Sequence, residues 1–246
     1  MLGDTEWQRV AGFRVVMSWP QTACAPPPTT LVSLRARVAG LAGAVLIMAG
    51  IVAVAVAIGA QVHAPRPSLA AAGALGPLGG GHGPRLRPSR PVSVDIPAIG
   101  VHSKLMHLGI NPDGTIQVPP LRTRAGEAAW YKYSATPGEI GTSVIEGHVD
   151  SQQGPAVFFR LGALTPGDRI DVTRADGITA VFRVTGVREY AKSRFPAKTI
   201  YGPAGYAALH LITCGGAFDY STGHYLSSTV VFASLTSSRR AHRAHQ

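Results

Sequence analysis

An uninterrupted apolar run at residues 38–60, VAGLAGAVLIMAGIVAVAVAIGA, is the longest hydrophobic pattern in the chain and contains no charged residue. At a rise of about 1.5 Å per residue, a helix of this length matches a bilayer hydrocarbon core about 30 Å thick. The apolar region of a cleaved signal peptide is shorter, typically about 7–15 residues. A buried core helix of this length would usually show a polar face. The run therefore predicts a transmembrane helix.

Residues 92–236 show a different pattern, in which short alternating or apolar runs are separated by turn signals. The turn signals are NPDG at 111–114, TPGEIG at 136–141, TPGD at 165–168 and ADG at 175–177. The runs between them, rich in β-branched residues, are 143–149, 169–174, 179–187, 208–214 and 228–235. Such spacing predicts an all-β barrel or sandwich, with residues 156–164 as a short helix or turn.

The segments around these two regions are polar or of low complexity. Residues 1–37 lack periodicity, which predicts a disordered tail, and the polar, basic composition of residues 237–246 predicts a second disordered tail. Residues 61–91 are rich in Ala, Gly and Pro, which predicts a flexible tether between helix and domain. Arg35 and Arg37 precede the apolar run and only Arg66 follows it closely, so the positive-inside rule predicts a cytoplasmic N-terminus.

The chain has 246 residues and a formal net charge of +10, but its basic residues are scattered or lie in the terminal and tether segments. A nucleic-acid-binding protein would gather them on one face or helix. The charge therefore favours attraction to an anionic membrane or cell-wall polymer. No CxxC, HExxH or HxH pattern, acidic cluster, phosphate-binding loop or GxSxG motif occurs, so neither a metal nor a cofactor is expected.

The two cysteines, Cys24 and Cys214, lie on opposite sides of the predicted membrane helix, which argues against a disulfide between them. Cys214 ends the strand-like run 211–214 and precedes two glycines, where a sulfur could be reached at the rim of a sheet. A buried apolar cysteine is the alternative. His148 also follows an apolar run and a glycine, and could be a core residue, a ligand or a base. His224, ten residues after Cys214, is its only rival as a partner for the thiol.

Two motifs, EGHVDS at 146–151 and LITCGGAFD at 211–219, give the chain its resemblance to the sortases. Further matching stretches lie at 92–119, 130–151, 154–172, 194–202 and 222–235, so that the resemblance covers essentially all of residues 92–236. In detail it is closest to the actinobacterial class E and F enzymes.

The resemblance implies an eight-stranded β-barrel with Cys214 and His148 at one mouth. The cysteine would attack a threonine carbonyl in an LPxTG-like sorting motif on a secreted protein and form a thioester. An amine of a cell-wall precursor or a pilin lysine would then resolve it, and Thr213, Gly215 and Ser228 would contact the substrate. The layout implies a single-pass membrane protein with its catalytic domain outside the cell.

One departure from the family pattern affects the expected chemistry. Sortases usually carry an arginine on the strand after the cysteine, whereas this chain has Leu-Ser-Ser-Thr at 226–229. Arg194 or Arg160 could replace it, backbone N–H and hydroxyl groups could suffice, or the protein could be a degenerate, non-catalytic barrel that binds a wall polymer or a partner. An L,D-transpeptidase is a further alternative, although those enzymes usually follow the cysteine with an arginine and Gly215 stands here.

Overall fold

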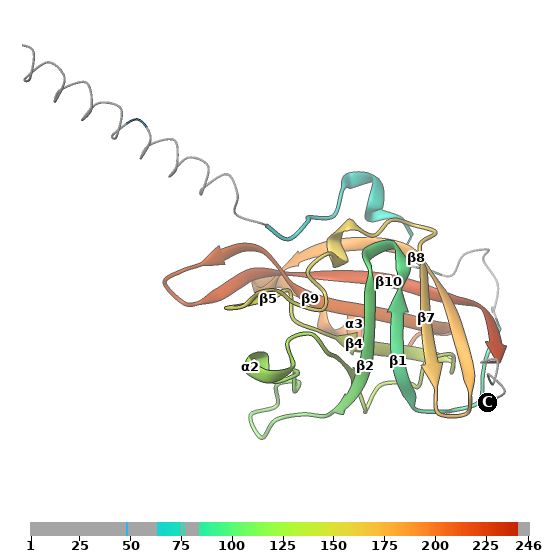
Figure 1. Ribbon diagram of the computed structural model, residues 1–246. Coiled ribbons are helices and arrows are strands. Elements are labelled where there is room, and N and C mark those ends of the chain that lie inside the picture. Colours follow the sequence, from blue (N-terminus) through green and yellow to red (C-terminus); the bar gives the residue numbers. More distant parts are fainter. Residues whose placement is uncertain (1–47, 49–62, 75, 77–83, 241–246) are drawn as a thin grey trace, which may run out of the picture. The chain divides into compact units, whose positions relative to one another are not determined.

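The computed structural model describes residues 48, 63–74, 76 and 84–240 of the chain. From residue 63 onward these belong to one compact unit, which is built around a closed β-barrel (Figure 1). The barrel strands are β1 (Pro91–Ile96), β2 (Val101–Leu108), β3 (Ala128–Tyr131), β4 (Gly141–Glu146), β7 (Arg169–Arg174), β8 (Ile178–Ala191), β9 (Ala207–Asp219) and β10 (His224–Arg240). The prediction of an all-β domain with an eight-stranded barrel is confirmed.

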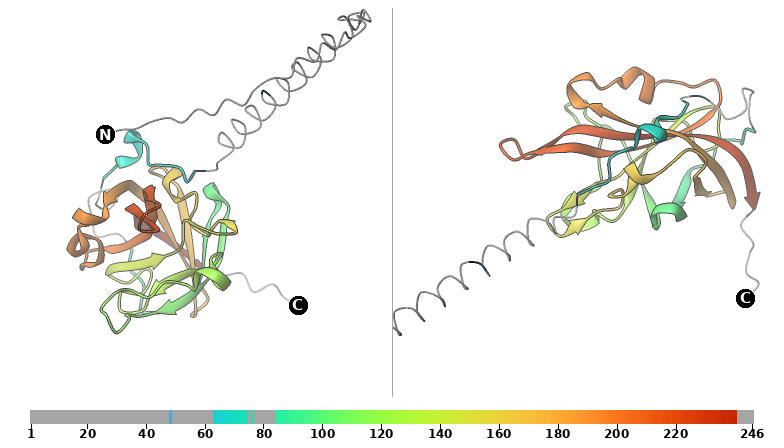
Figure 2. Two further views of the ribbon diagram at one scale, coloured as in Figure 1. Left: turned by 90° about the vertical axis from the view of Figure 1, so that its left-hand side faces the viewer. Right: turned by 90° about the horizontal axis from the view of Figure 1, so that it is seen from above.

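The strands follow the order β1-β2-β3-β4-β9-β10-β8-β7 around the barrel. Two pairs are parallel, β2 with β3 and β4 with β9, and the other pairs are antiparallel. The β9–β10 hairpin extends beyond the body of the barrel, as the views in Figures 1 and 2 agree. The parallel β4–β9 pair is the one that positions the two candidate catalytic residues.

The predicted turn signals separate strands as expected. Residues 175–177 form a turn that joins β7 to β8, and the TPGD signal at 165–168 immediately precedes β7. The stretch at 156–164, predicted as a short helix or turn, contains the 3₁₀ helix η3 (Leu161–Ala163). The remaining short elements are η1 (Leu69–Ala72), η2 (Pro97–Ile99), α2 (Leu121–Arg124), β5 (Asp150–Ser151), β6 (Gly154–Pro155), η4 (Lys192–Arg194) and α3 (Ala197–Tyr201).

Strand β4 and the first half of β9 bury side chains on both faces, whereas β2 alternates between buried and exposed positions. On β9, Leu209 and Leu211 belong to the main core cluster inside the barrel. Ile212, on the opposite face of β9, packs in a second cluster with Ile200 of α3. Helix α3 therefore covers the outer face of β9. For this reason His210 is buried there, with its Nδ1 2.7 Å from the Ile200 carbonyl oxygen.

Part of the segment predicted as a flexible tether packs against the barrel. The backbone N–H of Ala74 donates to the Thr185 carbonyl oxygen at 2.9 Å, and Ala71 is buried. Gly162 and Gly186 allow this approach, because a Cβ on either would lie within 2.5 Å of a carbonyl oxygen of the segment. Leu86 packs against the main core, so residues 84–90 are also held. A composition typical of linkers did not predict these contacts.

The basic C-terminal segment also differs from its prediction as a disordered tail. Strand β10 continues to Arg240, because the first half of β8 extends far enough to pair with it, Arg240 opposite Ile178. Arg239 adds an ion pair to the buried carboxylate of Asp171 at 2.5 Å.

Among the described residues, no helix is long and apolar enough to cross a membrane. The predicted span at 38–60 lies outside the described residues except for Met48, which is helical. The predicted tail at 1–37 and residues 241–246 also lie outside them.

Candidate active site

Cys214 lies at the point where β9 leaves the body of the barrel. Side chains on β9 alternate, so Thr213 continues the inward row of Leu209 and Leu211, whereas Cys214 continues the outward row of Ile212. Cys214 is a partly exposed free thiol. Its partner on β10 is Ser228, which is nearly buried. The sequence thus places a reachable sulfur directly after the fully buried part of β9, which is Ala207 to Thr213.

The two glycines after Cys214 are required by close packing. A Cβ on Gly215 would lie 2.6 Å from the Thr229 hydroxyl oxygen, and Gly216 has a φ of +76°, which favours glycine. A side chain at either position would push β10 away from β9. The two glycines therefore allow β9 and β10 to pack closely beside Cys214, and the substrate-binding role of Gly215 stays a prediction.

His148 lies two residues beyond the end of β4, in register with Cys214. Glu146 of β4 is paired with Ile212 of β9, and the Gly147 N–H donates to the Ile212 carbonyl oxygen at 3.1 Å. Because the two strands are parallel, the next residues of the outward rows are His148 on one chain segment and Cys214 on the other. The topology brings the two predicted residues to the same end of adjacent strands.

The His148 ring is held by a carbonyl on the segment before α2. Its Nε2 lies 2.5 Å from the Pro119 carbonyl oxygen, so this nitrogen carries the proton that is donated. Within residues 84–240, Nδ1 has no hydrogen-bond partner, and neither ring nitrogen hydrogen-bonds to Cys214. Contacts of this kind often tighten only when substrate binds. Because Nε2 carries the proton of the neutral ring, Nδ1 is available to accept a proton.

Two further contacts hold the segment around His148 in place. A Cβ on Gly147 would lie 2.7 Å from the ring of the fully buried Phe158, which explains the glycine before the histidine. The Tyr225 hydroxyl, on β10, donates to the Asp150 carboxylate, so the segment after His148 is tied to the hairpin that carries Cys214. Burial, with the hydrogen bond and charge of Asp150, raises the pKa of Tyr225.

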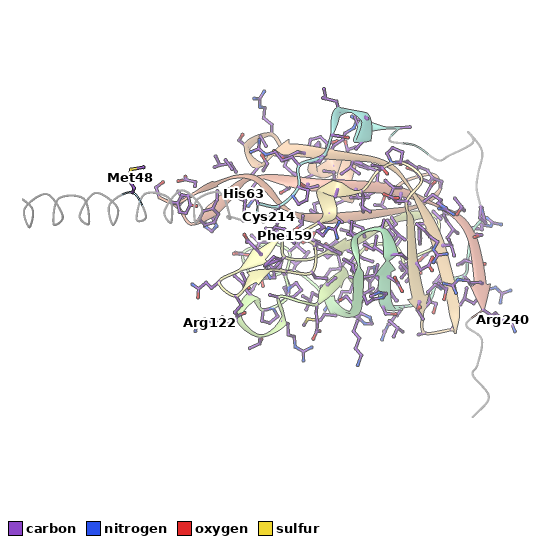
Figure 3. All side chains as sticks on the ribbon, turned by 45° about the horizontal axis from the view of Figure 1, so that its top comes forward. Met48, His63, Arg122, Phe159, Cys214 and Arg240 are labelled. Atoms are coloured by element: carbon purple, nitrogen blue, oxygen red, sulfur yellow. The ribbon has the colours of Figure 1, made fainter. Side chains whose placement is uncertain are left out.

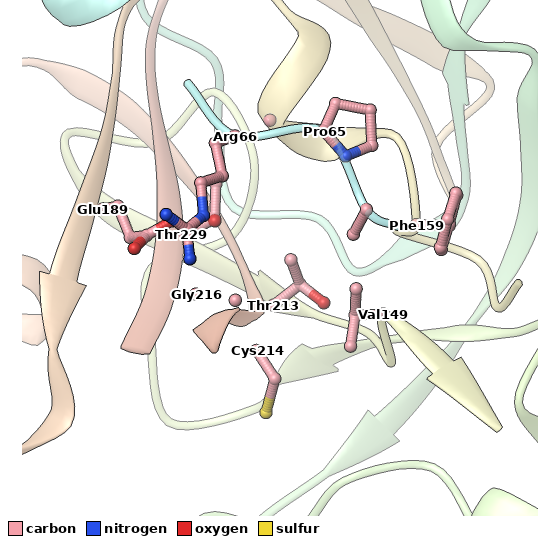
Figure 4. A pocket seen from close by; sticks show the side chains of 12 residues that line it. Pro65, Arg66, Val149, Phe159, Glu189, Thr213, Cys214, Gly216 and Thr229 are labelled. Carbon is pink, nitrogen blue, oxygen red and sulfur yellow. The ribbon is translucent and has the colours of Figure 1, made fainter. Parts of the chain in front are cut away.

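A small pocket lies on the inward side of Cys214 (Figure 4). Thr213, Cys214 and Val149 line it on one side, and Pro65 and Arg66 line it on the other. The sulfur points away from Pro65 and Arg66, so the residues around Pro65 close the barrel end and do not cover the thiol. Figure 3 shows Cys214, Phe159 and His63 close to one another near one end of the barrel, with Arg240 at the other end.

The residue that reaches the sulfur is a lysine. The Lys192 Nζ, in η4, donates to the Cys214 Sγ at 3.6 Å. Arg194, predicted as a substitute for the missing family arginine, lies two residues further along η4 and is exposed. Arg160, the other candidate, lines a separate pocket with Ile99 and His102. The groups expected from the sequence at this place were Arg194, Arg160 or backbone and hydroxyl groups, and Lys192 was missed.

A buried carboxyl group lies on the same outer face of the barrel. Glu146 accepts a hydrogen bond from the Tyr201 hydroxyl of α3 at 2.8 Å. Burial raises the pKa of Glu146 to about 7, and the hydrogen bond from Tyr201 lowers it by less. Burial and the neighbouring carboxyl group raise the pKa of Tyr201. The run SVIEGHV gave no sign that Glu146 is buried, because α3 covers it from a distant part of the chain.

The other candidate groups lie away from the thiol or are dispersed. His224, the alternative to His148, opens β10 opposite Asp219 near the hairpin tip and is exposed. Within the described ranges, no group of three His, Cys, Asp or Glu side chains is placed to hold a metal ion.

Comparison with protein-family models gives a match to the sortase domain over residues 94–236, which is more than half of the chain. The chain belongs to the sortase family. It is therefore related to cysteine transpeptidases, and this assignment favours the sortase reading over the L,D-transpeptidase one. The match covers β4 and β9 and includes both His148 and Cys214.

Solved structures of sortases are also similar to the chain at low identity. Sortase A of Listeria monocytogenes is 14% identical, with a TM-score of 0.47 over 64% of this chain and 93% of that one. A lid mutant of Corynebacterium diphtheriae sortase A is 22% identical, with a TM-score of 0.45 over 61% and 73%. The SrtA sortase of Actinomyces oris is 20% identical, with a TM-score of 0.45 over 67% and 90%. A search of curated proteins found no match.

Proposed function

We propose that this sortase-family protein cleaves an LPxTG-like sorting motif on secreted proteins and transfers the acyl group to an amine of a cell-wall precursor or a pilin lysine. The observation that carries the proposal is the register of β4 and β9. It sets His148 and Cys214 two residues beyond the paired Glu146 and Ile212, at one end of adjacent strands. Both residues belong to the motifs that gave the family resemblance.

In the proposed reaction, the Cys214 sulfur attacks the carbonyl carbon of the sorting motif. A C–S bond forms, and the carbonyl π electrons move onto oxygen. His148 Nδ1 takes the thiol proton and gives it to the leaving amine when the C–N bond breaks, which leaves a thioester on Cys214. An incoming amine then attacks the thioester, and the amide product and free thiol are released. The Pro119 carbonyl keeps the His148 proton on Nε2 and so leaves Nδ1 available.

The substrate would lie along the outer face of the strands, beside the sulfur. Gly215 follows the thiol on β9, and its backbone would contact the substrate beside Cys214. Ser228 lies across from the thiol on β10, and we propose that it contacts the substrate. Thr213 precedes the thiol on β9 with its side chain facing inward, and we propose that it helps to shape the site from that side. The Thr213 hydroxyl is buried and has no hydrogen-bond partner among the described residues.

We further propose that the protein is a single-pass membrane protein with a cytoplasmic N-terminus and an extracellular domain. The basis is the uncharged run at 38–60 and the position of Arg35 and Arg37 before it. This topology would put the thiol on the side where secreted substrates and cell-wall amines are found.

The test is peptide cleavage and transfer by the full-length chain in non-ionic detergent. A panel of LPxTG-like pentapeptides is incubated with an amine acceptor, and the products are separated by mass. Cleavage and transfer that are lost in both Cys214→Ala and His148→Ala support the proposal. His224→Ala is the matched control and should keep its activity. Full activity of Cys214→Ala would overturn the proposal.

A second function is favoured by one observation, the sequence Leu-Ser-Ser-Thr at 226–229 in place of the family arginine. In this second function, the domain would be a non-catalytic barrel that binds a wall polymer or a partner protein. Binding of a sorting peptide without any turnover, together with a Cys214 thiol that resists alkylation, would support it.

A further inference from the structure

The positive charge beside the thiol comes from η4, the short helix that follows β8. Lys192 lies immediately after β8, and its Nζ is 3.6 Å from the Cys214 Sγ on β9. Among residues 84–240, it is the only cationic side chain within hydrogen-bonding range of that sulfur. The contact joins the charged nitrogen of Lys192 directly to the sulfur that would attack the substrate.

The register of three strands explains how the lysine reaches the sulfur. Strand β10 lies between β8 and β9, and Ser227 of β10 is paired with Ala191 on one side and Gly215 on the other. Lys192 therefore starts one residue beyond this row and reaches across β10 to Cys214. The residue of β10 opposite Cys214 is Ser228, a small side chain.

Lys192 places a cation beside the sulfur, whereas the β10 segment that carries the arginine in other sortases has none here. The β10 residues at 226–229 carry no charge, and Leu226 is exposed. Arg160 lines a different pocket, and Arg194 has no hydrogen bond or ion pair among the described residues. Glu189 lines the inward pocket, whereas the sulfur points away from that pocket's Pro65 and Arg66, so this carboxylate does not occupy the sulfur's side.

We propose that Lys192 is a catalytic residue of this sortase, whose ammonium group stabilises the negative charge that forms at Cys214 and on the attacked carbonyl. The inference rests on the proposed function and names the group that takes the place of the arginine. The oxyanion is one bond away from the carbon that joins the sulfur, so a donor beside the sulfur can reach it. Lys192 forms no covalent bond and transfers no proton; it supplies charge only.

The first test is steady-state kinetics with a sorting-motif peptide. Removing one donor of this kind typically lowers kcat by about 10²–10³-fold, and we expect a loss in this range for Lys192→Met with KM changed less than threefold. Lys192→Arg should restore at least a tenth of wild-type kcat, because the charge is kept. Lys104→Met, on β2, is the charge-matched control. Unchanged kcat in Lys192→Met would overturn the proposal.

The second test does not depend on peptide turnover. Cys214 is alkylated with anionic iodoacetate or neutral iodoacetamide, and the rate is read at the Cys214 peptide by mass spectrometry, which separates it from Cys24. A cation about 4 Å from the sulfur should favour the anionic reagent by about fivefold, so this preference should disappear in Lys192→Met and persist in Lys192→Arg and Lys104→Met. An identical ratio in wild type and Lys192→Met would overturn the proposal.

The two tests separate this proposal from the proposed function. If no peptide is cleaved by wild type but the iodoacetate preference is lost in Lys192→Met, the transpeptidase assignment fails and the charge contact stands. If wild type cleaves peptides and Lys192→Met does so equally well, the lysine proposal alone fails.

Discussion

Glu146 should make the stability of the domain depend on pH in the direction opposite to a carboxylate held in an ion pair. Its side chain is buried beneath α3, and burial raises its pKa from 4.5 to about 7. Below pH 4.5 the carboxyl is protonated in both the folded and the unfolded chain, and the folded state keeps its full stability. Between pH 4.5 and 7 the unfolded chain ionises first, so the free energy of unfolding falls as the pH rises.

The size of this loss follows from the pKa difference. Since a tenfold change in an ionisation constant corresponds to about 1.4 kcal/mol, the pKa of about 7 lowers the free energy of unfolding by about 3 kcal/mol above pH 7. Glu146→Gln keeps an acceptor for the Tyr201 hydroxyl and stays neutral at every pH. We expect it to equal wild type within about 1 kcal/mol at pH 4 and to be more stable by about 3 kcal/mol at pH 8.

The assay is urea denaturation of the full-length chain in non-ionic detergent, followed by tryptophan fluorescence at pH 4 to 8. Glu127→Gln is the control, because this carboxyl group is partly exposed beside Arg124. Its replacement should alter the profile by less than about 1 kcal/mol. If Glu146→Gln shows the same dependence on pH as wild type, the buried carboxyl is not responsible and the reasoning is refuted.

Two further predictions concern the segments that hold the site. Gly162→Val would place a Cβ 2.0 Å from the Pro65 carbonyl oxygen, so proteolysis near Pro65 should accelerate at least tenfold, whereas Gly205→Val, in open space, should leave the rate unchanged. Equal proteolysis of the two variants would contradict this packing. Tyr225→Phe removes the hydrogen bond to Asp150 and should lower the free energy of unfolding by about 1–2 kcal/mol by urea denaturation. In a double-mutant cycle with Asp150→Asn, purely additive effects would show that the bond contributes nothing.

The all-β class could be predicted because the strands are local patterns with clear ends, whereas the closed eight-stranded barrel was implied by the family resemblance. Strand β7 has the bounds predicted for it, and β9 begins within one residue of its prediction. The glycines after Cys214 also marked this position in the sequence, but the reason for them, the close approach of Thr229 and Ser227 of β10, is visible only in the structure. The β4–β9 pairing that brings His148 and Cys214 together followed from the family resemblance, because alternation alone does not determine which strands become neighbours.

The groups that tune the site could not be predicted, because each depends on contact between distant segments. His210 alternates with Leu209 and Leu211 as a solvent-facing residue would, but α3 covers that face. Lys192 follows β8, and Cys214 lies on β9, with β10 between them. Lys192 can reach Cys214 across β10 because the residue of β10 opposite Cys214 is the small Ser228. Residues 63–74 have the composition of a linker, yet backbone contacts to Thr185 and the close approach at Gly162 hold them on the barrel.

Intact-mass measurement of the full-length chain, quenched with acid during reaction with a sorting-motif peptide, tests the central claim most directly. The account predicts a protein whose mass is increased by the acyl half of the cleaved peptide, attached to Cys214 and released by hydroxylamine, with no such species in Cys214→Ala. Peptide cleavage at the wild-type rate by Cys214→Ala, or turnover by wild type with the acyl group attached at another residue, would contradict it.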